Sequence, residues 1–97
     1  MATSYFIFKK NLSTEKTILV SSGSHDTEEQ CSEHFHWYMY GFMDGAFEIL
    51  GLDNFQMMSG SREFSFQFSV DGKMNVEYFM LFDQAGHDLI MEISKSE

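Results

Sequence analysis

Proline is missing from this 97-residue chain, and cysteine occurs once, at position 31. A lone cysteine cannot form an internal disulfide, so the fold has to rest on its hydrophobic core. The chain also lacks an apolar stretch near the roughly 18 residues that a membrane span requires, and it lacks the apolar N-terminal run of a signal peptide. These absences predict a cytoplasmic protein that does not associate with membranes.

Basic residues are missing from the middle of the chain. No Lys or Arg occurs between Thr17 and Ser61, whereas seven Asp and Glu residues lie there, and the formal net charge of the whole chain is −9. Such a segment repels nucleic acid and anionic membranes, and it attracts basic partners. Ordinary solubility is the alternative explanation for this charge, and the sequence leaves it open.

Core-forming residues are abundant. Hydrophobic residues make up 43% of the chain and aromatic residues 16%, including eleven Phe. This composition excludes disorder caused by a shortage of apolar side chains. The length suits one domain, which we place at residues 1–97.

The pattern of apolar residues predicts an α+β fold. A capping box at Thr27 and Gln30 and a stop at Gly51 predict one long amphipathic helix over residues 28–50. Alternating or continuous apolar residues predict strands at 4–10, 16–21, 63–70, 73–82 and 87–93. We therefore expect one helix packed on a mainly antiparallel sheet of about five strands, in the order β-β-α-β-β-β.

The register of the hairpin around Asp71 and Gly72 can be argued from the faces of its strands. A two-residue turn would place Phe66 opposite Glu77 and mix apolar with charged side chains. A three-residue loop instead pairs Phe66 with Val76. We expect the second register.

The next predicted hairpin places Phe79 opposite Ile90, with Leu81 beside them, on the sheet face that the single helix does not cover. A contiguous apolar cluster on a surface usually marks a partner or a second copy of the chain. The alternative is that residues 54–61 fold over it. We expect a homodimer that self-associates through Phe79, Leu81 and Ile90.

Candidate chemistry is sparse. Cys31, His34 and His36 resemble a metal-binding pattern, but on a helix His36 points away from the other two, so we expect no metal. Cys31 falls on the core side of the helix, which disfavours a thiol nucleophile. Without a phosphate-binding glycine loop either, we expect neither an enzyme nor a cofactor.

Two helical glycines, Gly41 and Gly45, each cost about 1 kcal/mol of helix stability relative to Ala. Gly45 lies on the core side, where close packing against the sheet explains it. Gly41 lies at the edge of that side and has no such explanation.

The outer arc of the helix combines carboxylates with large aromatic side chains. Trp and Tyr are enriched at interface hot spots, and carboxylates steer the approach of a partner. The alternative is that residues 54–61 cover Trp37. The predicted partner-binding residues are Glu29, Glu33, Trp37, Tyr40, Asp44, Phe47 and Glu48.

The function that these features favour is that of a small acidic binding protein. It would cover a basic surface on a partner protein, such as a nucleic-acid-handling enzyme or a toxin, and act as an inhibitor or nucleic acid mimic without binding nucleic acid itself. The alternative function is a homo-oligomeric structural or adaptor module.

Overall fold

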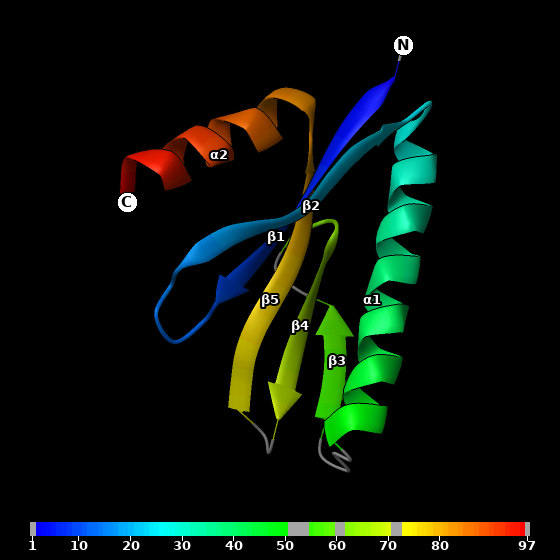
Figure 1. Cartoon of the computed structure of the whole chain (residues 1–97), viewed down its shortest axis with the longest axis vertical. Coiled ribbons are helices and arrows are strands. Elements are labelled where there is room, and N and C mark those ends of the chain that lie inside the picture. Colours follow the sequence, from blue (N-terminus) through cyan, green and yellow to red (C-terminus); the bar gives the residue numbers. More distant parts are fainter. Residues whose placement is uncertain (1, 51–54, 60–61, 71–72, 97) are drawn as a thin grey trace.

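The computed structural model describes the backbone of residues 2–50, 55–59, 62–70 and 73–96; the side chains of 42–50, 55–59, 69–70, 73–75 and 96 are left out of the description. Within these ranges, five strands and two helices follow one another along the chain (Figure 1). In chain order they are β1 (Thr3–Asn11), β2 (Thr17–His25), α1 (Glu28–Leu50), β3 (Phe55–Ser59), β4 (Ser65–Val70), β5 (Lys73–Phe82) and α2 (Asp83–Ser96).

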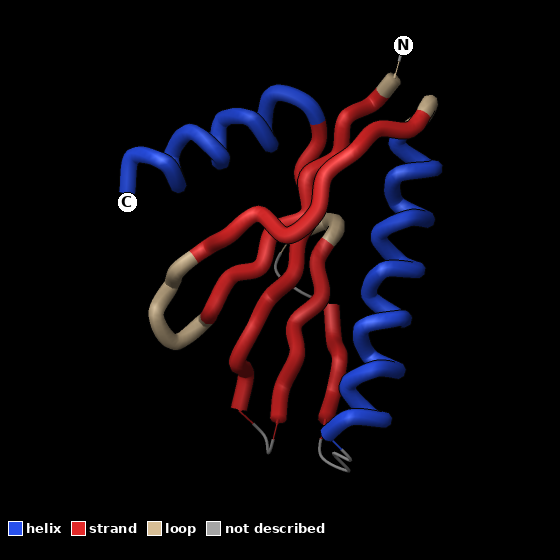
Figure 2. The backbone as a smooth tube through the Cα atoms, viewed as in Figure 1, coloured by secondary structure: helices blue, strands red, loops and turns tan. Residues whose placement is uncertain are grey.

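The strands form one sheet (Figure 2). Their order is β2-β1-β5-β4-β3, and every neighbouring pair is antiparallel. Three of the pairs, β1–β2, β3–β4 and β4–β5, join strands that are consecutive in the chain. The sheet is joined at its centre by β1 and β5, which come from opposite ends of the chain and pair Ile7 with Met80. As a result, β2 and β3 are the two outermost strands.

The central strands are buried on both faces. Tyr5–Phe8 form an unbroken buried run in β1. Tyr5 and Ile7 pack against α1, and this side of the sheet is called the α1 face. Phe6 and Phe8 point the other way, toward Phe79 and α2, and this side is called the α2 face.

Helix α2 covers part of the α2 face. Its residues Leu89, Ile90 and Ile93 pack against the cluster of Phe6, Phe8 and Phe79. The α+β class is therefore confirmed, but the strand expected at residues 87–93 is wrong, because this segment is helical. The sheet has a helix on each face, where a single helix had been expected.

The apolar cluster at Phe79, Leu81 and Ile90 exists, but it is covered within the chain. Phe79 is only 1% exposed. It pairs with Phe8 in β1 rather than with Ile90, which lies on α2. The expected cross-strand pair is therefore wrong, and the predicted self-association surface loses its geometric basis.

Residues 55–59 form an edge strand. From the sequence, this segment was considered only as one that folds over either the outer sheet face or Trp37. They pair instead with β4, with Met57 opposite Phe68. Both covering alternatives are therefore wrong for the part of this segment that the structure describes.

The β4–β5 hairpin contains a bulge, which sets the register of its two strands. Pairing starts with Val70 opposite Lys73, as a two-residue turn would require, although residues 71–72 themselves lie outside the described part of the chain. The register then shifts between Phe68 and Ser69, so that Phe66 faces Tyr78. The expected register was wrong because an extra residue in one strand restores the matching of faces without a longer loop.

Helix α1 begins as the sequence indicates and has the expected bounds. The Gln30 amide N–H donates to Thr27 Oγ1 at 3.1 Å. The Gln30 side chain reaches back to accept from the Asp26 amide at 3.0 Å, one residue earlier than a standard capping box. The expected stop at Gly51 lies outside the described residues.

Helix α2 starts without a loop. Asp83 directly follows β5 and has a left-handed φ of 47°. Its carboxylate accepts a hydrogen bond from the Ser4 amide at 3.0 Å, which ties the turn to β1. Gly86 then lies against the Phe6 ring so closely that a Cβ atom there would overlap it. This close approach lets α2 settle on the sheet.

We expect Gly86→Ala to lower the free energy of unfolding by about 1–3 kcal/mol, because the added methyl overpacks the contact with Phe6. Gly41→Ala is the matched control. Among the described residues, no atom beyond the helix's own nearby backbone lies within 4 Å of a Cβ built there, so this change should raise stability by about 1 kcal/mol. Urea unfolding measures both, and equal effects would contradict this account of α2 packing.

Candidate partner-binding surface

Helix α1 buries one stripe and exposes the opposite one. Cys31, Phe35 and Met39 recur every four residues and are fully buried against the sheet. The opposite stripe carries Trp37, which is 76% exposed, and Tyr40, which is 47% exposed. Helical periodicity therefore placed these two aromatic side chains correctly on the solvent side.

Two carboxylates share this stripe with the aromatic residues. Glu29 and Glu33 are both exposed, and they lie one helical turn apart, with Glu33 one turn before Trp37. We call Glu29, Glu33, Trp37 and Tyr40 the acidic aromatic surface. The backbone of α1 continues through Asp44, Phe47 and Glu48, whose side chains lie outside the described part of the chain.

The charges close to this surface in sequence are all negative. Asp26 and Glu28 precede the surface and are also exposed. Neither Glu29 nor Glu33 has a cation nearby in sequence, since Lys and Arg are absent between Thr17 and Ser61. The N-terminal end of a helix favours carboxylates, so folding tolerates this crowding. The result is an anionic surface that attracts cations over a Debye length of about 8–10 Å.

A hollow adjoins this surface. His36 contacts the rings of Tyr40 and Phe66, with centroid separations of 6.1 Å and 5.5 Å. The hollow measures about 230 Å³ and is lined by Ser32, Phe35, His36, Arg62, Glu63, Phe64, Ser65 and Phe66. The sequence had placed His36 on the surface but not beside β4, because that neighbour depends on how α1 sits on the sheet.

The three residues of the metal-like pattern go to different places. Cys31 is buried and its thiol lies 3.7 Å from the Thr3 carbonyl oxygen. His34 shares a 3.1 Å hydrogen bond with Tyr5 Oη, and exposed His36 faces Phe66. Within the described residues, no group of three His, Cys, Asp or Glu side chains is arranged to hold a metal ion.

Tyr5 is the centre of a small aromatic cluster that holds the start of α1 to the sheet. The His25 ring stacks on Tyr5 at 5.5 Å, and the His34 ring lies 4.8 Å from Tyr5. Gly23, opposite Tyr5 in β2, leaves room for the phenol, since a Cβ there would come within 2.7 Å of Tyr5 Oη. The cluster fixes the position from which the acidic aromatic surface projects.

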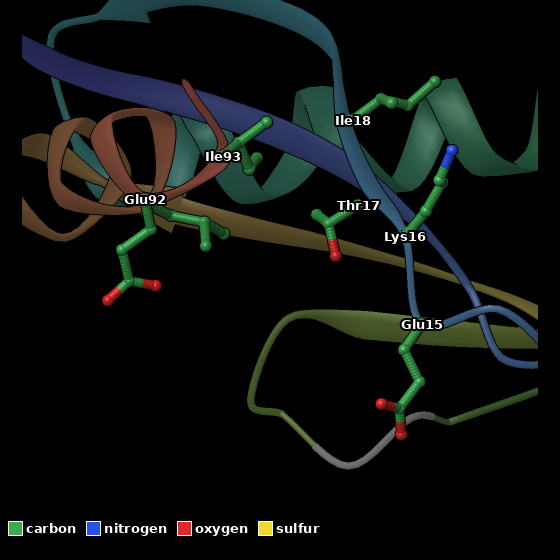
Figure 3. Close-up of a pocket in the computed structure, with 7 residues that line it drawn as sticks. Glu15, Lys16, Thr17, Ile18, Glu92 and Ile93 are labelled. Carbon is green, nitrogen blue, oxygen red and sulfur yellow. The ribbon is translucent and has the colours of Figure 1, made fainter. Parts of the chain in front are cut away.

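A second, larger hollow lies between the β1–β2 hairpin and α2 (Figure 3). It measures about 510 Å³. Leu89 and Ile93 contribute apolar area, while Glu15 and Glu92 bring charge. In Figure 3 the two glutamate side chains do not converge on one point, so the hollow lacks the convergent polar groups that orient a small-molecule ligand.

No helix in the described part of the chain is both long and apolar enough to cross a membrane. Comparison with known proteins assigns no family: no family model matches the chain, and neither a curated protein nor a solved structure matches it significantly. The functional argument therefore rests on the geometry of the chain itself.

Burial raises the pKa of the Cys31 thiol above its ordinary value of 9.0, with nearby carboxylates adding to the effect. Native protein should therefore react with a thiol reagent far more slowly than unfolded protein. Because the folded state favours the neutral thiol, the stability that it contributes is complete below pH 9 and is lost as the pH rises further. Thiol titration with and without urea tests this, and fast labelling of the native chain would contradict it.

Trp37 is the single tryptophan of the chain, so its fluorescence reports on this surface alone. Compared with a free, uncharged tryptophan analogue, we expect a higher ratio of caesium quenching to iodide quenching, because the neighbouring carboxylates concentrate cations and repel anions. Glu33→Gln should reduce this ratio, whereas Glu15→Gln, in the distant hairpin, should not. A ratio equal to that of the free analogue would show that the surface has no anionic field.

Proposed function

We propose that this chain is an intracellular binding protein whose acidic aromatic surface covers a basic surface on a partner protein. The observation that carries the proposal is the exposure of Trp37 among carboxylates that have no Lys or Arg near them in sequence. A large aromatic side chain that contributes nothing to its own core becomes useful when a partner buries it.

Charge and aromatic area have separate tasks in this proposal. Glu29 and Glu33 act at a distance, so they raise the rate at which a cationic partner arrives. Trp37 and Tyr40 act on contact, where burial of their rings slows dissociation. His36 and the adjoining hollow extend the contact toward β4 and offer space for one side chain of the partner.

Gly41 also supports a partner-binding role for this side of α1. It lies one turn after Trp37, is exposed, and meets no described atom that would explain the lack of a side chain. A partner backbone that approaches the helix closely at this point would supply the missing explanation.

The partner class follows from charge. Proteins that bind nucleic acid present clustered Lys and Arg, which suit an anionic surface on a second protein. We therefore propose an inhibitor that occupies such a cationic surface. We place it in the cytoplasm, because a chain with one cysteine forms no internal disulfide and so needs no oxidising compartment. The carboxylates would take the place of phosphate groups.

The test separates the two tasks kinetically. Partners are captured from cytosol on the immobilised chain at low salt, released at high salt, and purified for binding measurements. Glu33→Lys should lower the association rate and weaken its salt dependence. Trp37→Ala should raise the dissociation rate, at a cost of roughly 2 kcal/mol or more if Trp37 is a hot spot.

Two changes elsewhere serve as matched controls. Glu15→Lys makes the same charge change on the hairpin, and Met91→Ala removes an apolar side chain exposed on α2. Both should leave the two rates near those of the original chain. If Trp37→Ala and Glu33→Lys behave like these controls, α1 presents only a solvated face and the proposal fails.

A further inference from the structure

Strand β2 has one free edge. It is an outermost strand of the sheet, and β1 is its partner on the other side. The free edge presents backbone N–H and C=O groups that no described strand pairs with. Such an edge is a template for another strand, and proteins usually block it with lysine, proline, a β-bulge or a short strand. Strand β2 has a bulge at Val20, but it lacks the residue types that block an edge. Residues 17–24 of β2 contain neither proline nor any Asp, Glu, Lys or Arg.

This edge strand also exposes apolar side chains on both of its faces. Ile18 is 52% exposed and Leu19 is 41% exposed. Leu19 lies opposite Phe8 and so on the α2 face, whereas Ile18 lies opposite Lys9 on the α1 face. Figure 3 shows the same alternation, with Lys16 and Ile18 extending to one side of β2 and Thr17 to the other.

A bulge divides β2 into two halves of opposite alternation. The register with β1 shifts so that Ser21 faces Ile7 and Leu19 faces Phe8, which leaves Val20 as the extra residue. Val20 packs against the core on the α1 face, and Ser21 lies on that face as well. Odd-numbered residues before the bulge and even-numbered residues after it therefore share the α2 face.

We propose that a second copy of the chain pairs antiparallel with β2 along this edge, about a two-fold axis between Val20 and Ser21. In this register every residue from 17 to 24 meets a residue on the same face of the sheet. A shift by one position would set residues of opposite faces against each other. The four pairs, each formed twice, are Thr17–Ser24, Ile18–Gly23, Leu19–Ser22 and Val20–Ser21.

Side-chain sizes suit this register. Ile18 would lie beside the second copy's Gly23, whose missing side chain leaves backbone exposed for Ile18 to cover. The glycine is required there, because a Cβ would collide with the Tyr5 hydroxyl. Leu19 would lie beside the second copy's Ser22 on the α2 face. Both exposed apolar side chains thus gain cover from a small residue.

The charges at the two ends of β2 are complementary. The hairpin end is basic, with three lysines and one carboxylate: Lys9, Lys10, Lys16 and Glu15. The other end runs into the acidic start of α1, at Asp26 and Glu28. Antiparallel pairing brings Lys16 of each copy beside the second copy's His25–Asp26, so opposite charges meet at both ends of the interface.

This surface is separate from the acidic aromatic surface. It uses β2, whereas the partner-binding residues lie on the outer side of α1. One proposal can therefore fail while the other holds.

Sedimentation of the isolated chain tests the association directly. We expect a reversible dimer, and we expect Leu19→Lys to raise its dissociation constant about tenfold or more, because a lysine on the edge opposes strand pairing. Met91→Lys, at an exposed apolar position on α2, is the control and should leave the dimer unchanged. A monomer at every concentration, or equal effects of the two lysines, would overturn the proposal.

Cross-linking tests the register. Leu19→Cys and Ser22→Cys are prepared as separate variants, and buried Cys31 does not compete. Opposite residues in an antiparallel pair are roughly 4.5–5.5 Å apart at Cα, within reach of a disulfide. Residue 19 of one chain and residue 19 of the second copy lie three positions apart along the paired strands, or about 10 Å.

Oxidation should therefore link the two variants when they are mixed, and should link neither variant alone. Circular dichroism confirms that each variant is folded before mixing. A disulfide dimer formed by one variant alone, at the rate seen in the mixture, would overturn the register. Absence of any linkage in the mixture would overturn the pairing.

Discussion

The structure depends on one constraint: β1 and β5 carry apolar side chains on both faces at the centre of the sheet. Tyr5–Phe8 and Tyr78–Met80 are buried without interruption. Strands of this kind require cover on both sides, and one helix can supply only half of it. Helix α1 covers one face and α2 part of the other, which leaves β2 and β3 at the edges and the outer arc of α1 in solvent.

Local features of the fold were predictable, and long-range ones were not. The bounds of α1 follow from helical periodicity and its cap at Thr27, which need no knowledge of the rest of the chain. The prediction for the α2 segment was wrong because Leu89, Met91 and Ile93 occur at every second position, which is also the pattern of a strand. Exposed Met91 decides for the helix, yet its exposure is visible only in the fold. The unbroken run Tyr5–Phe8 was the available signal that a second cover was needed.

The same distinction applies to the candidate surfaces. Glu29, Glu33, Trp37 and Tyr40 share an arc because of helix geometry alone, so the sequence placed them together correctly. The contact of His36 with Phe66 joins two elements distant in sequence and had no local signal. The exposed edge of β2 could not be anticipated either, because it depends on β5 pairing with the opposite side of β1.

The pairing of β1 with β5 also sets the order in which this chain can fold. The two central strands, β1 and β5, lie far apart in the sequence. The chain between them must therefore form a closed loop before either strand is covered. During synthesis, Phe6 and Phe8 emerge before α1, and their partners on β5 and α2 emerge after it. A nascent chain that has completed α1 can cover the α1 face of β1, but the other face of β1 stays apolar and open until β5 and α2 have been made.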